Sequence, residues 1–186
     1  MKWIKQLLLI VISTVVVAYL LKWSSDYLGF RSPAFAFFAN LLIMVWIALL
    51  SQVWVFAYPP GYFVIKPFEK EGRIYEKLGI VFFKKLIRGG SLLIFNPTRH
   101  LSENAKSISG LENEMRKAEA GHLTVFLVVL LFACMAMVRG WFDAGGWLLL
   151  FSIILNGYPI MLQRYNRIRL HQIVANQNKK AKKQNK

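Results

Sequence analysis

The 186-residue sequence has one cysteine and only nine acidic residues, and it also lacks several motifs that mark common classes of enzyme. The single cysteine, Cys134, permits no intramolecular disulfide, and a thiol inside an apolar run is usually a packing side chain. No glycine-rich nucleotide loop is present, and no serine or cysteine stands in a recognisable nucleophile motif. We therefore expect neither a disulfide scaffold, nor a nucleotide-dependent enzyme, nor a covalent acyl-enzyme.

Charge of either sign is missing from four stretches, and these predict the fold class. A backbone in hydrocarbon must pair its own N–H and C=O groups, so each stretch should be helical, and about 20 residues cross the bilayer core. The third stretch becomes long enough if its helix starts near Glu119. The sequence predicts an all-α polytopic membrane protein with four transmembrane helices. The uncharged stretches are Leu7–Leu21, Ser32–Phe63, Leu123–Val138 and Ala144–Gln163.

The distribution of positive charge predicts the orientation. Of 24 Lys and Arg residues, only Lys22, Arg31 and Arg139 lie in the two short connections between apolar stretches. Positive residues stay on the cytoplasmic side, so both termini and the long central segment should be cytoplasmic. No clear small-residue cleavage site follows the first apolar run, which favours an uncleaved anchor over a signal peptide. We expect a multi-pass protein of the cell (plasma) membrane.

These features divide the chain into four parts. Residues 1–58 form two N-terminal transmembrane helices, and residues 59–122 form a basic cytoplasmic loop at the membrane interface. Residues 119–163 form two C-terminal transmembrane helices, and residues 164–186 form a basic cytoplasmic tail. The Asn-, Gln- and Lys-rich composition from Asn176 onward predicts a disordered end.

The central loop has helical patterns of its own. The prolines at Tyr58-Pro59-Pro60-Gly61 are expected to end the second span. Residues Arg73–Arg88 place a narrow basic stripe beside apolar residues at helical spacing, which predicts one helix lying in the membrane interface. Gly89-Gly90 should end it. A further helix is expected to begin after Ser107 or Ser109 and to run into the third span.

The pair Glu119 and His122 is the strongest candidate for chemistry. Spacing of i and i+3 places both side chains on one helix face, with Arg116 one turn earlier. A carboxylate beside an imidazole orients the ring and raises its basicity, as general-base catalysis requires. The same residues could instead anchor the helix among lipid headgroups. A metal site with His100 as third ligand is a weaker alternative, because di-iron bundles need more carboxylates and a second Glu-x-x-His motif.

Arginines elsewhere could bind an anionic substrate. Arg99 precedes His100 in a polar loop, and its planar fork suits phosphate or carboxylate. Asn156 interrupts the fourth apolar stretch, where a polar side chain normally faces a helix partner or a cavity. The exit from that stretch carries Arg164, Arg167 and Arg169, which could clamp a phosphate or simply flank a membrane helix.

Four ordered motifs together resemble one family, the glycosyl-diaponeurosporenoate acyltransferases of staphyloxanthin-type carotenoid biosynthesis. The resemblance covers about residues 58–172, and the first two spans match only in being apolar. It implies transfer of a fatty acyl group to a sugar hydroxyl of a membrane-embedded glycosylated polyene. The motifs are Phe68-Glu69-Lys70-Glu71-Gly72-Arg73-Ile74-Tyr75-Glu76-Lys77, Arg99-His100-Leu101, Arg116-Lys117-Ala118-Glu119-Ala120-Gly121-His122 and Gln163-Arg164-Tyr165-Asn166-Arg167-Ile168-Arg169-Leu170.

Together these observations predict an O-acyltransferase of the membrane. The donor would be a cytoplasmic acyl thioester, either acyl-CoA or acyl carrier protein, and the acceptor a glycosylated carotenoid or similar membrane lipid. His122 would be the general base, Glu119 its orienting partner and His100 the reserve base. We expect no metal, no cofactor and no nucleic-acid partner.

The remaining assignments concern substrate binding and the rival interpretations. Arg99 or Arg116 would stabilise the oxyanion or the donor. A non-catalytic membrane anchor or scaffold subunit is the main alternative function. A transporter is disfavoured, because the spans have no ionisable residue to mark a path. The residues assigned to substrate binding are Arg99, Arg116, Arg164, Tyr165, Asn166 and Arg167.

Overall fold

The structure is a computed structural model that describes residues 2–54, 56, 58–69, 71–89 and 108–184. Throughout these ranges the chain is helical, with short turns and no strand, which confirms the all-α prediction. Within them, four helical segments are long and apolar enough to cross a membrane, as the sequence predicts. These segments are Trp3–Leu28, Pro33–Leu50, Ile108–Val138 and Phe142–Asn176.

The chain divides into two compact units, each described separately. The apolar unit comprises Met1–Ala57 and Ala120–Pro159, and the charged unit comprises Tyr58–Glu119 and Ile160–Lys186. Helix α6 (Ile108–Val138) contributes its first part to the charged unit and its second part to the apolar unit. The charged unit thus combines the predicted central loop with the predicted tail.

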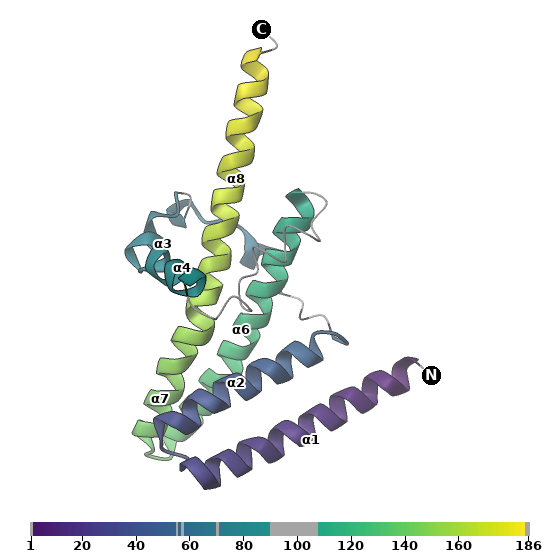
Figure 1. Cartoon of the computed structure of the whole chain (residues 1–186), viewed down its shortest axis with the longest axis vertical. Helices are drawn as coiled ribbons and strands as arrows, with labels where there is room; N and C mark the ends of the chain where they lie inside the picture. The colour runs from purple at the N-terminus through teal and green to yellow at the C-terminus, as the bar shows by residue number, and fades with distance from the viewer. Residues whose placement is uncertain (1, 55, 57, 70, 90–107, 185–186) are drawn as a thin grey trace. The chain divides into compact units, whose positions relative to one another are not determined.

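The apolar unit begins with a hairpin of α1 (Lys2–Leu28) and α2 (Pro33–Leu50), which lie side by side (Figure 1). Gly29 makes the turn possible, because its φ of 80° is a backbone conformation that L side chains rarely adopt. Ser32 then caps α2 by accepting a hydrogen bond from the Phe35 amide. The Trp46 indole donates to Thr14 at 3.1 Å and ties the two helices together.

The buried centre of the apolar unit lies between α2, α6 and α7 (Phe142–Ser152). Small residues permit this packing: Ala36, Ala39 and Ala133 are at most 3% exposed. At Gly145 an added Cβ would lie only 3.0 Å from the Ala133 carbonyl oxygen, so only glycine fits there without a shift. Close approach of α6 and α7 therefore depends on glycine and alanine.

The second span ends earlier than predicted. Helix α2 stops at Leu50 and gives way to turns over Ser51–Val53, whereas the prolines at 59 and 60 were expected to end it. The Ser51 hydroxyl donates to the Ala48 carbonyl at 2.7 Å. Serine side chains compete in this way for backbone groups and so favour helix ends. The uncharged stretch of sequence therefore extends beyond the end of the helix.

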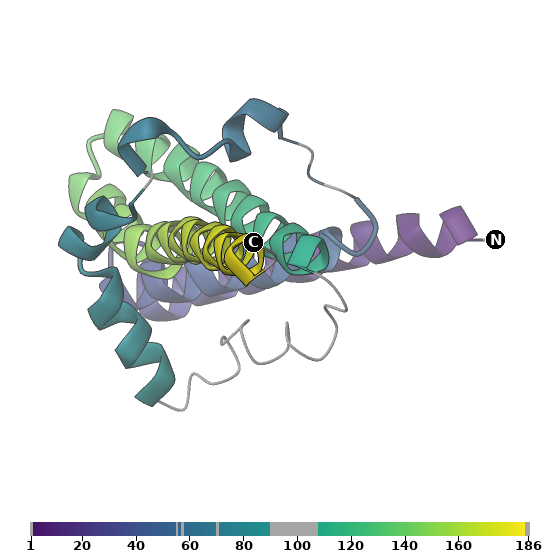
Figure 2. The same cartoon turned by 90° about the horizontal axis from the view of Figure 1, so that it is seen from above.

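The segment predicted to form one interfacial helix, Arg73–Arg88, instead forms two helices in the charged unit. These are α3 (Arg73–Lys77) and α4 (Ile80–Gly89) (Figure 1 and Figure 2). The break falls at Gly79, whose φ of 81° lies outside the helical region. Side-chain periodicity predicts a single helix here because it contains no information on the backbone conformation of a glycine. Before α3, two 3₁₀ turns, η1 (Pro60–Phe63) and η2 (Pro67–Glu69), shape the start of the loop.

The last helical segments follow α7 without a loop. A π-helical turn, η4 (Ile153–Gly157), leads into α8 (Tyr158–Gln184). The turn contains Asn156 and ends two residues before Pro159, which cannot donate the backbone hydrogen bond of a regular helix. Helix α8 continues to Gln184, so the prediction of a disordered end from Asn176 is wrong. Lysine and glutamine have good helix propensity and extend a helix that is already formed.

Candidate functional site

Glu119 lies in the charged unit, at the centre of a buried cluster of ionic side chains. Its carboxylate is 0% exposed. Oε1 accepts a hydrogen bond from Arg164 Nε at 2.7 Å, and Oε2 forms an ion pair with Arg167 Nη2 at 2.9 Å. The two arginines thus supply the compensating positive charge that a buried carboxylate needs. Its predicted role in orienting His122 stays a prediction.

Arg164 connects three segments of the charged unit. While Nε binds Glu119, its Nη1 donates to Glu69 at 2.5 Å and its Nη2 donates to the Tyr62 carbonyl. The guanidinium also lies over the Tyr62 ring, 4.8 Å from its centroid. Every nitrogen of this guanidinium is therefore occupied by the protein itself.

Arg167 is even more deeply enclosed, at 1% exposure. Besides its ion pair with Glu119, it donates from Nη1 to the Phe63 carbonyl at 2.8 Å and stacks over the Phe63 ring. Two arginines and two glutamates leave the cluster formally neutral. The predicted phosphate clamp of Arg164 and Arg167 stays a prediction, and the contacts of both residues are those of a support for the loop.

Glu69 is the residue of this cluster that sequence reasoning missed. It is 2% exposed, and it accepts from the Tyr75 hydroxyl and from the Lys66 amide at 2.7 Å. Burial alone would raise the pKa of Glu69, but the hydrogen bonds from Tyr75, Lys66 and Arg164 outweigh burial and hold it below its ordinary value. The available signal was its place in the Phe68–Lys77 motif, beside Gly72.

The two tyrosines around the glutamates remain protonated donors. Burial, followed by the nearby Glu69 carboxylate, raises the pKa of Tyr75 to about 12. Burial and then the Glu119 carboxylate likewise raise the pKa of Tyr62. A phenol with a raised pKa keeps its proton at neutral pH, so both hydroxyls remain available as hydrogen-bond donors.

The remaining substrate-binding candidates of this unit are partly enclosed. Tyr165 is buried, donates to Glu76 at 2.8 Å and packs on Gly72. Asn166 is half-buried. Arg116 is the most accessible, with 43% of its side chain exposed although Nη2 binds Glu112 at 2.7 Å.

His171 also belongs to this region. Its Nε2 lies 3.1 Å from the second oxygen of Glu112, on the opposite side of that carboxylate from Arg116. Arg99 and His100 lie outside the described residues, so their predicted roles stay predictions. Within the described ranges no group of three His, Cys, Asp or Glu side chains gathers as metal ligands would.

His122 belongs to the apolar unit, where its ring contacts Asn156. The Nδ1 atom lies 3.3 Å from Asn156 Oδ1, and the side chain is half-buried. Asn156 in turn donates to Asn40 at 3.3 Å, and both amides are at most 1% exposed. The expectation that Asn156 faces a helix partner or a cavity is thus confirmed. Asn40 was missed, although a lone amide in an apolar span is itself a signal.

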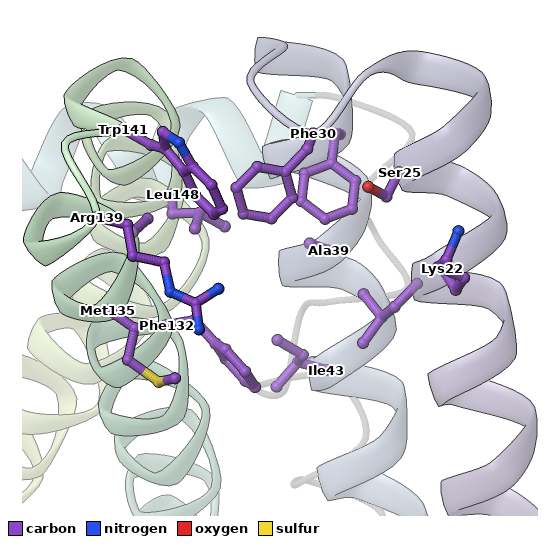
Figure 3. Close-up of a pocket in the computed structure, with 13 residues that line it drawn as sticks. Lys22, Ser25, Phe30, Ala39, Ile43, Phe132, Met135, Arg139, Trp141 and Leu148 are labelled. Atoms are coloured by element: carbon purple, nitrogen blue, oxygen red, sulfur yellow. The ribbon is translucent and has the colours of Figure 1, made fainter.

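A cavity of about 380 Å³ lies in the same unit, between α1, α2, α6 and α7 (Figure 3). Its lining is almost entirely apolar, with Phe30 and Trp141 close together at one end and Phe132 with Ile43 at the other. The Arg139 guanidinium reaches toward it from the turn after α6 and lies over the Trp141 ring. Within the described residues Arg139 has no acidic partner.

One residue, Leu148, connects the cavity with the hydrogen-bonded series of Asn40, Asn156 and His122, which is called the polar chain below. Leu148 lines the cavity, and its carbonyl oxygen accepts from Asn40 Nδ2 at 3.4 Å. Along α6, Phe132 follows His122 by ten residues, roughly 15 Å at 1.5 Å per residue.

Comparison with known proteins identifies the family of this chain. The family model described as glycosyl-4,4'-diaponeurosporenoate acyltransferase matches residues 59–176. The chain belongs to this family. It is therefore an acyltransferase of carotenoid biosynthesis, which uses an acyl donor and a glycosylated carotenoid acceptor. No curated protein and no solved structure matches the chain.

The match includes the whole charged cluster and the histidine site except for Asn40. Glu69, Glu119, Arg164 and Arg167 all fall inside residues 59–176, as do His122 and Asn156. The hairpin of α1 and α2 falls outside it. This agrees with the sequence resemblance, in which the first two spans match only in being apolar.

Proposed function

We propose that the chain is an O-acyltransferase of the plasma membrane that esterifies a sugar hydroxyl of a glycosylated carotenoid at the cytoplasmic face. The observation that carries the proposal is the His122 ring, which is half-buried and held through one nitrogen by Asn156. A ring fixed on one side presents its other nitrogen in a defined direction, as a general base requires.

The reaction needs no covalent intermediate on the protein. His122 Nε2 removes the proton of the acceptor hydroxyl as that oxygen attacks the carbonyl carbon of the acyl thioester. The carbon–sulfur bond breaks, an ester forms, and the sulfur leaves with the proton that the imidazolium returns. The products are an acylated sugar and a free thiol, which belongs to coenzyme A for one of the two predicted donor classes and to acyl carrier protein for the other.

The charged unit supports the donor side of this proposal. Arg164 and Arg167 hold the loop containing Tyr62, Phe63 and Glu69, so they shape the surface that meets the donor. The exposed part of Arg116 offers positive charge to the phosphates of coenzyme A or to an acidic carrier protein. The basic cytoplasmic tail adds to the same attraction.

The cavity of the apolar unit is the proposed place of the acceptor's apolar body. Its lining is almost entirely apolar, and Leu148 of this lining also accepts a hydrogen bond from Asn40. A polyene with its sugar at the cytoplasmic face would extend along the spans into this space. Binding there would align the sugar hydroxyl with His122 and remove most of the orientational freedom of the reaction.

The test is turnover by purified variants in detergent, measured as acylated product from a glycosylated carotenoid and an acyl thioester. His122→Gln should lower turnover by about a hundred- to ten-thousandfold, the usual contribution of a general base, with expression unchanged. Wild-type turnover in this variant, together with loss in His100→Ala, would transfer the role to His100. Wild-type turnover in both would exclude a histidine base.

A second pair of variants tests the cavity. Ala39 lines the cavity and is 3% exposed, whereas Ala34 lies exposed on the same helix. Ala39→Leu should raise KM for the acceptor with little change in kcat, because it fills space needed by the apolar body. Ala34→Leu is the matched control and should leave both constants unchanged. An unchanged KM in Ala39→Leu would place the acceptor elsewhere.

A further inference from the structure

We infer that Asn40 and Asn156 are positioning residues that fix the tautomer of His122, with the proton on Nδ1 and the lone pair on Nε2. This deepens the proposed function and rests on it for its catalytic meaning. The inference begins at Asn40, which is 1% exposed within an apolar span. A buried amide in such a place must find hydrogen-bond partners, because each unsatisfied group is costly.

The orientation of Asn40 is fixed by two backbone carbonyls. Its side chain lies 2.9 Å from the Ala36 oxygen and 3.4 Å from the Leu148 oxygen. Carbonyl oxygens only accept, so the amide NH₂ must face them and the Asn40 oxygen must point the other way. Turning this amide over would place its oxygen against two other oxygens. The α2 and α7 backbones therefore determine which way Asn40 points.

This orientation is passed on to Asn156. The Asn40 oxygen can only accept, so Asn156 must direct its NH₂ toward it, and that contact is 3.3 Å long. The Asn156 oxygen then faces the His122 ring at 3.3 Å from Nδ1. An oxygen without a hydrogen must receive the proton of its partner. His122 Nδ1 is therefore the N–H, and Nε2 keeps its lone pair in the neutral ring.

The π-helical turn explains how Asn156 reaches this position. A π-turn inserts an extra residue into a helix, and such turns are frequent at functional sites. Here it lies at Ile153–Gly157 and leaves Asn156 fully enclosed. Ser152, one turn earlier, is equally buried, but its hydroxyl has no hydrogen-bond partner within the described residues. Asn40, Asn156 and His122 are thus linked by hydrogen bonds, and Ser152 makes no hydrogen bond to any of them.

The polar chain of Asn40, Asn156 and His122 draws one of its residues from the N-terminal hairpin. Asn40 lies outside the 59–176 family match, on a helix that resembles the family only in being apolar. The α1–α2 hairpin therefore does more than anchor the protein, because it supplies the residue that sets the protonation pattern of the base. A chain without the hairpin would leave the Asn156 amide free to turn and His122 free to adopt either tautomer.

The test is nitrogen NMR of the full-length protein labelled with ¹⁵N-histidine in detergent micelles, at a pH well above the usual imidazole pKa. The His122 signals are assigned by their loss in His122→Gln. Wild-type protein should show His122 as a single Nδ1–H tautomer, whereas Asn40→Leu and Asn156→Leu should show a mixture. Ser152→Ala removes a neighbouring buried hydroxyl that does not belong to the polar chain, and it should leave the tautomer unchanged.

Two outcomes would overturn the inference, namely an Nε2–H ring in the wild type, or a single Nδ1–H ring in both leucine variants. Asn156→Asp keeps the accepting oxygen and should keep the wild-type tautomer, so one variant remains informative if the leucine variants misfold. The measurement needs no turnover. An Nδ1–H ring in a protein that transfers no acyl group would uphold the positioning chain and exclude the proposed function, while an Nε2–H ring in an active enzyme would do the reverse.

Discussion

At the scale of single residues, the decisive contacts join groups that are far apart in sequence. Glu119 meets Arg164 across 45 residues, and Glu69 meets the same arginine across 95. The i, i+3 spacing of Glu119 and His122 indicated a shared face, but spacing does not reveal which distant cation will occupy a carboxylate. A buried acid is satisfied by the nearest strong donors, and a guanidinium is a stronger donor than an imidazole.

Removing the Glu119 charge tests the importance of this cluster. Glu119→Gln should lower the stability of the folded protein by about 3–5 kcal/mol, because it leaves buried arginine charge without compensation. The measurement is unfolding of purified protein in a denaturing detergent series. Glu114→Gln on the same helix is the control, since its ion pair with Lys117 is exposed and should contribute under about 1 kcal/mol. Equal stability of the two variants would show that the cluster is not a structural centre.

At the scale of helices, hydropathy predicted each span but not each helix end. The runs of uncharged residues located α1, α2, α6 and the segment from α7 to α8 correctly, because burial in hydrocarbon depends on composition. The end of α2 at Leu50 and the break at Gly79 depend on a serine hydroxyl and on a glycine φ. Such local backbone preferences are weak in sequence, and tertiary packing decides whether they are used.

Two adjacent glycines of α7 allow a sharp test of helix packing. An added Cβ at Gly145 would meet Met137 at 2.6 Å and the Ala133 carbonyl at 3.0 Å, whereas one at Gly146 would meet nothing within 4 Å. Gly145→Ala should destabilise the protein by about 1–3 kcal/mol through overpacking. Gly146→Ala should be neutral or stabilising by up to about 1 kcal/mol, because alanine favours the helix. Thermal unfolding in one detergent compares the two, and the reverse order would contradict the packing of α6 on α7.

At the scale of the whole molecule, the charge distribution predicts the topology. The two short turns of the apolar unit carry acids that offset their cations, since Asp26 pairs with Lys22 and Asp143 with Arg31. Of the three cations in the two short connections, only Arg139 has no acidic partner among the described residues. The predicted external side is thus nearly neutral, while 21 of the 24 basic residues lie in the segments predicted to be cytoplasmic.

Topology reporters test this arrangement directly. Reporters fused near Asn104 and after the C-terminus should read cytoplasmic, and one inserted near Asp143 should read external. Each fusion is compared with the same reporter on a protein of known orientation. A cytoplasmic reading at Asp143 would mean that the last two apolar segments enter and leave on one side, and would contradict four spans.

Sequence reasoning thus located the candidate site without its partners. It selected Glu119 and His122 from their i, i+3 spacing, and it selected Arg164 and Arg167 from the basic end of the fourth apolar stretch. It also noted Asn156, because an amide inside an apolar stretch is unusual. It missed Glu69 and Asn40, whose roles depend on contacts with other helices. No pattern along one segment contains that information, since a hydrogen-bond partner 116 residues away is specified only by the folded chain.

The buried Glu119 cluster also imposes an order on synthesis. The ribosome makes Glu119 and Glu69 well before it makes Arg164, the arginine that pairs with both. At about 5–20 residues per second, the 45 residues between Glu119 and Arg164 take about 2–9 s. During that interval the nascent chain carries two acidic groups whose final partners do not yet exist. A chain truncated before Arg164 lacks the cation that pairs with both glutamates, so the buried cluster cannot form in incomplete products.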